Sequence, residues 1–168
     1  VLVGLGIQTA SEVGLVKYAQ NMISMQQYSL QSPTAEIPLD NQIQRIVVEA
    51  EGYPSLKIHT ASSNSILYYG TSQMRAQSKE EAQSLMQEKE QVNTHQVGNT
   101  LYLSLILARS DRFYECSYNL VLPEGLAVEI NRSGTPLKIV AGNISSDWTI
   151  QGNGRTEISL PGQSDLLI

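Results

Sequence analysis

The chain has 168 residues, a length that fits one ordinary domain with an appended segment. Only 16% of the residues are charged and the formal net charge is −5, which excludes the basic electrostatic footprint of a nucleic-acid-binding protein. Cys116 is the only cysteine, so an intrachain disulfide is excluded, and this low cysteine content fits a cytosolic protein and a bacterial envelope protein equally well.

The N-terminal residues 1–7 carry no charge and are mostly apolar. They are too short to cross a bilayer, which requires about 20 apolar residues. Two interpretations stay open. The segment is the start of a core strand or helix, or it is the end of a transmembrane helix whose first part is missing.

Residues 8–31 predict a helix, because Val13, Val16 and Ala19 begin a series of apolar residues at spacings of three and four. Ser11 can serve as its N-terminal cap. This helix either packs on the domain or acts as a juxtamembrane stalk or self-association helix. Methionine recurs on interaction surfaces, which fits the second use, but packing on the domain is the favoured interpretation.

A break follows the predicted helix, because Pro33 and Pro38 remove backbone donors and disfavour helix just before them. The sequence therefore predicts two parts. Residues 1–36 form an N-terminal helical or juxtamembrane segment with a linker, and residues 37–168 form a β-domain.

Alternation of apolar and polar residues then predicts a series of short strands separated by turn residues, with Gly98 and Asn99 forming a tight turn. The predicted strands cover residues 43–50, 56–60, 65–70, 92–97, 101–107, 113–122, 126–130, 137–141, 144–150 and 156–160.

One helix interrupts the strands over residues 78–90. Ser78 and Glu81 have the spacing of a capping box, in which a hydroxyl and a carboxylate bond to the first turn. The remaining pattern indicates a short amphipathic helix with a narrow apolar stripe, made of Ala82, Leu85 and Met86.

Turn residues recur about every ten positions after residue 122, as in a sandwich, a barrel or a solenoid. We therefore expect a mostly β fold of stacked short strands, either β-solenoid-like or a β-sandwich, with an N-terminal helix and one short amphipathic helix. The regular turn spacing favours the stacked, solenoid-like arrangement.

The sequence offers few residues for metal binding or nucleophilic catalysis. Neither His59 nor His95 has an acidic residue at ligand spacing, so we expect no metal site. Cys116 falls in the middle of a predicted strand. It is expected to act as a small buried hydrophobe rather than as a nucleophile paired with a histidine.

Paired carboxylates for acid–base chemistry are also scarce. Glu80, Glu81, Glu88 and Glu90 fall on the polar helix, where charge is normally solvated. No apolar pocket that could raise a carboxyl pKa is evident, and neither a phosphate-binding loop nor a Gly-x-Ser-x-Gly elbow is present. We therefore expect a protein that is not an enzyme and needs no cofactor.

Tyrosines on or beside the predicted strands are the candidate binding residues. One interpretation is that they fill half-buried strand faces. The other is that they form an aromatic strip that binds sugars or a partner protein. The set consists of Tyr53, Tyr68, Tyr69, Tyr102, Tyr114 and Tyr118.

The order of these segments resembles the bacterial adhesin-like domain family of unknown function, of the auto-transporter adhesin or head-domain type. The resemblance covers residues 40–162. Its most specific part is a strand ending in Leu122 and Pro123, followed by a short apolar strand and a glycine turn. The resembling segments are residues 43–48, 56–58, 78–82, 98–103 and 118–130.

The resemblance implies a stacked β architecture outside the cytoplasmic membrane, often after a single membrane helix, and some relatives are linked to envelope-stress systems. It implies no catalytic residues. The methionine- and glutamine-rich helix predicted over residues 8–31 departs from the family pattern.

The leading hypothesis is a non-enzymatic extracytoplasmic β-domain, anchored to the bacterial cytoplasmic membrane, that presents a binding or scaffold surface to an envelope component or a protein partner. The alternative is an oligomeric structural protein that assembles through the N-terminal helix and an open end of the sheet. A carbohydrate-active β-solenoid enzyme is the least favoured hypothesis, because its acidic residues would have to gather on one face.

Overall fold

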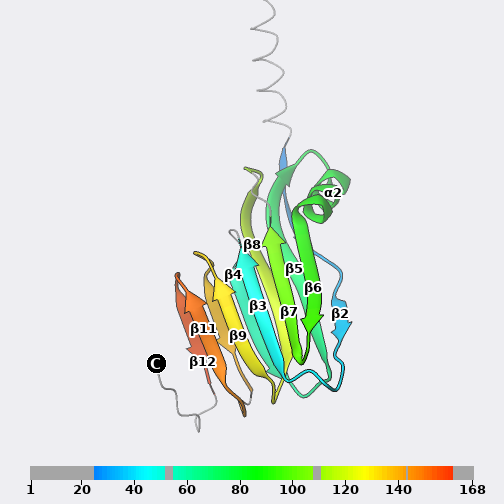
Figure 1. The fold of residues 1–168 in the computed structure, drawn as a ribbon. Coiled ribbons are helices and arrows are strands. Elements are labelled where there is room, and N and C mark those ends of the chain that lie inside the picture. Colours follow the sequence, from blue (N-terminus) through cyan, green and yellow to red (C-terminus); the bar gives the residue numbers. More distant parts are fainter. Residues whose placement is uncertain (1–24, 52–54, 108–110, 143, 161–168) are drawn as a thin grey trace, which may run out of the picture.

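The computed structural model describes residues 25–51, 55–107, 111–142 and 144–160, which form two β-sheets and one helix (Figure 1). The elements are β1 (Gln26–Gln31), β2 (Ala35–Pro38), β3 (Arg45–Glu51), β4 (Ser55–Ala61), β5 (Ser65–Ala76), α2 (Lys79–Lys89), β6 (Glu90–Val97), β7 (Thr100–Leu107), β8 (Phe113–Pro123), β9 (Ala127–Arg132), β10 (Leu137–Val140), β11 (Trp148–Gly152) and β12 (Thr156–Ser159).

The two sheets divide the strands between them. Sheet A has the order β1-β5-β8-β4-β10-β12, and β2 pairs with the same edge of β5 as β1 does. Sheet B has the order β11-β9-β3-β7-β6. Buried side chains from both sheets form one shared core, so the sheets pack face to face and α2 lies at one end (Figure 1).

Four strand pairs alternate between the sheets. In β3–β4, β7–β8, β9–β10 and β11–β12, the first strand lies in sheet B and the second in sheet A. Neighbouring pairs are parallel, and they stack in the order β7–β8, β3–β4, β9–β10, β11–β12. The antiparallel strands β1, β2, β5 and β6 complete the sheets beyond the first pair.

The parallel register brings equivalent apolar positions into rows across the core. In sheet B, Ile46 lies between Leu101 and Val128, and all three are buried. In sheet A, Ile58 lies in register with both Leu120 and Ile139. Each fully buried aliphatic side chain of this kind contributes about 1.5–3 kcal/mol relative to an exposed one. The alternation in the sequence therefore selects the face that each strand buries.

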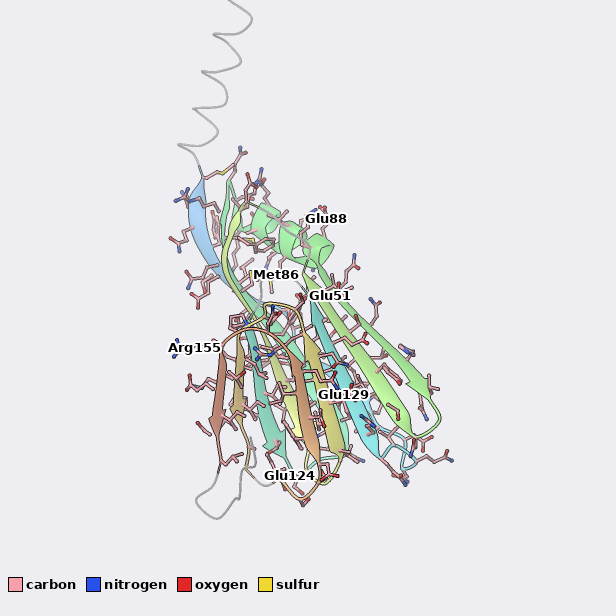
Figure 2. All side chains as sticks on the ribbon, turned by 60° about the vertical axis from the view of Figure 1, so that its left-hand side comes forward. Glu51, Met86, Glu88, Glu124, Glu129 and Arg155 are labelled. Atoms are coloured by element: carbon pink, nitrogen blue, oxygen red, sulfur yellow. The ribbon has the colours of Figure 1, made fainter. Side chains whose placement is uncertain are left out.

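The predicted helix is confirmed as α2. Ser78 Oγ accepts a hydrogen bond from the backbone N–H of Glu81 (3.1 Å), as the capping spacing predicts. The helix packs on the upper part of β5 through a small cluster that is separate from the main core, and Figure 2 shows Met86 beneath α2. The buried residues of this second cluster are Met74, Ala76, Ala82 and Met86.

The N-terminal prediction is wrong where the structure can test it. Residues 8–24 lie outside the described residues, but the predicted helix also included residues 26–31, and these form β1. Tyr28 and Leu30 alternate with Ser29 in the period of two that is typical of a strand, and β1 pairs antiparallel with β5. Because β1 and β2 both belong to sheet A, the β structure also begins before Ile37, where the sequence placed its start.

The fold class is confirmed as mostly β, and the two facing sheets fit a β-sandwich-like architecture. The described part of the chain contains no helix that is long and apolar enough to cross a membrane.

Candidate functional site

The outer face of sheet A, which points away from the core, carries a hollow of about 130 Å³ across four adjacent strands. We call it the polar trough. Its lining residues come from β1, β5, β8 and β4, and all are polar. They are Ser29, Lys57, Thr71, Ser72, Gln73, Glu115 and Ser117.

The strand register explains why the sheet is hollow at this place. Thr71 and Ser117 are cross-strand partners with short side chains, and their hydroxyl oxygens lie 2.6 Å apart. The next pair of outward positions in one direction is Gln73 and Glu115, whose side chains are longer. Short side chains therefore form the floor of the polar trough, and longer ones rise beside them.

On the opposite side, Lys57 lines the polar trough and belongs to the next row of outward positions. Asn119 lies in register with Tyr69 on β5 and with Lys57 on β4. Asn119 is only 7% exposed although it points away from the core, which fits its place between two larger neighbours. The polar trough thus has an ammonium and a carboxylate beside one polar floor, and Tyr69 lies in the same row of outward positions as the ammonium.

The charges of the polar trough balance. The ammonium of Lys57 makes no hydrogen bond or ion pair with any described residue, and Glu115 Oε2 accepts one hydrogen bond from Gln73 Nε2 (3.3 Å). One ammonium donor and one carboxylate acceptor are thus available to a ligand.

The outer face of sheet B is closed by contacts among its own side chains. The rings of His95 and Tyr102 stack with centroids 4.7 Å apart and an angle of 6° between their planes. Val47, the neighbour of Tyr102 on β3, is only 4% exposed. Arg45 forms an ion pair with Glu129, which lies on the visible face of β9 in Figure 2.

The structure distributes the described candidate tyrosines over three environments. Tyr69 lies on the outer face of sheet A beside the polar trough, and Tyr102 lies on the outer face of sheet B. Tyr68 packs against the core, and Tyr118 is 2% exposed with its hydroxyl donating to the Ile106 carbonyl (2.9 Å).

Tyr53 and the side chain of Tyr114 lie outside the described part of the chain. The described tyrosines therefore do not form one strip, and a binding role for Tyr69 stays a prediction. Thr71, Gln73, Glu115 and Ser117 were missed as site residues, because only the register of β5 and β8 brings them together.

Glu90 corrects the expectation that all carboxylates near the helix are solvated. It is the first residue of β6, and its side chain lies against Gly70, where an added Cβ would come within 2.5 Å of Oε1. Oε1 is buried without a hydrogen-bond partner, and a cavity of about 10 Å³, the size of one water, adjoins it. Burial raises the pKa of Glu90, although a hydrogen bond with Ser32 lowers it in part.

The described residues do not assemble a catalytic pair from Cys116 and a histidine. His59 pairs with Val121, five positions from Cys116 along β8, which is roughly 16 Å at the rise of a strand. His95 lies in the other sheet, and burial raises the pKa of the Cys116 thiol, which disfavours the reactive thiolate. Within the described ranges, no group of three His, Cys, Asp or Glu residues could hold a metal ion.

Comparisons with known proteins show likeness at the level of structure. The chain is similar to a "putative cell adhesion protein" from Clostridium sporogenes, with a TM-score of 0.48 and 11% identity over 76% of this chain and 57% of that one. A "putative adhesin" from Parabacteroides merdae gives a TM-score of 0.37 and 14% identity over 76% of this chain and 55% of that one. A "putative lipid binding protein" from Parabacteroides distasonis gives a TM-score of 0.32 and 12% identity over 80% of this chain and 66% of that one.

The chain thus spans just over half the length of the first two of these structures. No family model and no curated protein matches the sequence.

Proposed function

We propose that the chain is a non-enzymatic β-domain that a bacterium displays outside its cytoplasmic membrane, and that the polar trough is its binding surface for an envelope component or a protein partner. The polar trough carries this proposal, because it is a hollow on a sheet, with an ammonium that no described residue pairs and with a carboxylate beside it. Rigid elements hold a binding site more accurately than loops do.

The stacking of the strands supports a scaffold role in this proposal. Four strand pairs stack side by side, and their apolar residues are buried in the core between the two sheets. The stacked strands would present the outward side chains of sheet A at fixed spacings, which lowers the cost of ordering the binding surface when it meets a partner.

The membrane anchor in this proposal lies on the N-terminal side of β1. The adhesin-like family resemblance supports this topology. β1 is the edge strand of sheet A and contributes Ser29 to the polar trough, so the anchor would join the domain close to its binding surface.

Protease accessibility tests the location. In a bacterium that expresses the natural full-length protein, we expect protease added to spheroplasts to remove a tag fused after residue 168, while a cytosolic marker stays intact. A tag that survives together with the marker, and that fractionates with the cytosol, would contradict the proposed location.

Retention of envelope material tests the binding role. Purified chain immobilised on beads should retain bacterial envelope fragments, and Lys57→Met combined with Thr71→Val should reduce the retention. The matched control is Lys138→Met combined with Thr149→Val, which makes the same chemical changes on exposed positions outside the polar trough. Equal retention by all three proteins, or no retention by any, would contradict the proposed binding surface.

A second candidate function is self-assembly through the open end of the stack. β11 and β12 are the edge strands of sheets B and A, and β11 contains no charge and no proline that would block pairing with another strand. The terminal core layer, which includes Trp148 and Ile158, is only partly buried.

Sedimentation equilibrium of the full chain tests this second candidate. We expect the wild type to associate as its concentration rises, and Thr149→Lys on the edge of sheet B to remain monomeric. Gln42→Lys adds the same charge on an exposed turn and should associate like the wild type. A monomeric wild type would remove the assembly hypothesis.

A further inference from the structure

We infer that the polar trough binds an uncharged polyhydroxylated ligand, namely one sugar residue of a neutral glycan. This inference rests on the proposed function, because it names the ligand class of the same surface. It follows from the hydrogen-bonding groups of the polar trough, from its charge balance and from its size.

The hydrogen-bonding groups match those of a sugar. The floor holds the hydroxyls of Thr71 and Ser117, and a hydroxyl both donates and accepts. Lys57 adds a pure donor on one wall and Glu115 adds a pure acceptor on the other. A sugar hydroxyl can form a hydrogen bond with a donor or with an acceptor, whereas an apolar ligand would leave all of these groups without partners.

The charges disfavour ionic ligands. Lys57 and Glu115 sum to zero within the polar trough, so a ligand with a net charge would meet one attractive and one repulsive group. The chain as a whole carries a net charge of −5, which adds repulsion against polyanions such as acidic glycans or acidic peptides. An uncharged ligand meets no such penalty.

The size restricts the direct contact to one small unit. A volume of about 130 Å³ is well below the roughly 300–1,000 Å³ typical of pockets that enclose a drug-sized ligand. One sugar residue is therefore held in the polar trough, and the rest of the glycan extends over the sheet. We expect weak binding by a single site, in the millimolar range, because few groups are engaged.

Tyr69 supplies a place for the apolar face of a sugar ring. It is partly exposed and lies two positions from Thr71 on the same face of β5. Tyrosine combines a rigid apolar surface with a polar tip, which suits contact with an amphipathic ring. Tyr102 on the opposite sheet is occupied by its stack with His95, so it provides a matched control.

Titration of the full chain followed by NMR tests the ligand class. The probes are maltotetraose, cellotetraose and chitotetraose as neutral glycans, and tetragalacturonate as an acidic glycan of the same length. We expect at least one neutral tetrasaccharide to shift the amide signals of residues 69–73 and 115–119, and to bind about tenfold more tightly than tetragalacturonate.

Variants locate the site. Tyr69→Ala, and separately Lys57→Met with Thr71→Val, should weaken the binding of the neutral tetrasaccharide about tenfold. Tyr102→Ala, and Lys138→Met with Thr149→Val, should leave it unchanged. Circular dichroism verifies that each variant is folded. Equal losses in the trough variants and their controls would overturn the assignment of the site.

Three outcomes show whether this inference, the proposed function or both are wrong. If no neutral tetrasaccharide binds while envelope fragments are still retained through the polar trough, the ligand class is wrong and the binding role survives. If tetragalacturonate or an acidic peptide binds more tightly than every neutral probe, the charge argument is overturned. If neither glycans nor envelope fragments bind, both proposals fail.

Discussion

At the scale of single residues, Glu90 couples the stability of the fold to pH. Its carboxyl is largely buried beside Gly70, and the loss of hydration raises its pKa. The same carboxylate contributes to the raised pKa of Tyr118, after burial as the larger cause. The folded protein therefore binds a proton at Glu90 more strongly than the unfolded chain does.

This linkage gives a pH-dependent prediction for Glu90→Gln. Because the folded-state pKa is raised, the wild type is most stable below the ordinary pKa of glutamate and loses stability as the pH rises through the raised value. The variant cannot ionise, so its stability advantage should be absent at acidic pH and appear towards neutral pH. Urea denaturation across this range measures it, with Glu49→Gln, an exposed carboxylate, as the control. A constant difference at all pH values would contradict the linkage.

Arg132 is the second residue whose environment makes it structurally decisive. It is only 8% exposed, and its guanidinium donates hydrogen bonds to the backbone carbonyls of Thr135 (2.6 Å), Arg155 (3.0 Å) and Gly154 (3.1 Å). A further bond reaches the hydroxyl of Thr156. One side chain thus joins the turn after β9 to the turn before β12.

We predict that Arg132→Met lowers the free energy of unfolding by about 3 kcal/mol, because several carbonyls lose their donor. Arg132→Lys should lower the free energy of unfolding almost as much, since an ammonium lacks the planar fork that reaches separate carbonyls. Chemical denaturation measures both variants. Arg45→Met, on an exposed ion pair, should cost less than about 1 kcal/mol, and equal costs at the two positions would contradict the role of Arg132.

At the scale of elements, the end of β11 requires glycine for a different reason from the turn between β6 and β7. Gly152 has a φ of +108°, and an added Cβ would lie 1.8 Å from the Arg132 carbonyl oxygen. Gly98 has a φ of +59°, and an added Cβ would meet nothing within 4 Å. The first glycine is needed for close approach, and the second only for its backbone conformation.

The two glycines give a matched pair of predictions. Gly98→Ala should cost about 1 kcal/mol, the penalty of a left-handed conformation alone. Gly152→Ala should cost about 3 kcal/mol, because the backbone of β9 or β11 must also move. Thermal or chemical unfolding measures both, and a smaller cost at Gly152 than at Gly98 would contradict this interpretation.

Most strands could be predicted from the sequence because each buries one face against the core. Ile46 and Val48, for example, alternate with Arg45 and Glu49 in a period of two. The N-terminal segment was misjudged at residues 26–31, where a helical spacing upstream was extended over a strand of six residues. Glu90 was misjudged because the helix ends just before it, and the first strand residue turns towards Gly70.

At the scale of the whole molecule, the candidate site could not be predicted, since it depends on strand order. Thr71 and Ser117 are separated by 46 residues, and no local pattern shows that β5 and β8 are neighbours. The spatial order of the strand pairs is also non-sequential, because β7 pairs with β3 on one side while β9 pairs on the other. The alternation in the sequence predicts which polar residues face outward, but only the strand register shows which of them are neighbours.

The division of the apolar residues into two clusters predicts that the region around α2 unfolds locally more easily than the main core. Met86→Ala should lower the local stability around α2 by about 2 kcal/mol, because it removes a 5% exposed side chain from the smaller cluster. Hydrogen exchange should become faster in α2 and β1, while β3 and β9 keep their protection. Equal acceleration in all four elements would show instead that the two clusters unfold as one.

The position of β1 at the edge of sheet A determines how the domain would carry a mechanical load. A pull between the N-terminal end of β1 and a ligand held at Ser29 and Thr71 passes through the six residue pairs that join β1 to β5. These pairs run side by side along the strands, so they resist such a force in shear and share it. The strand pairs from β9 to β12 lie outside this route, and the attached ligand would stay held even if the far end of the stack opened.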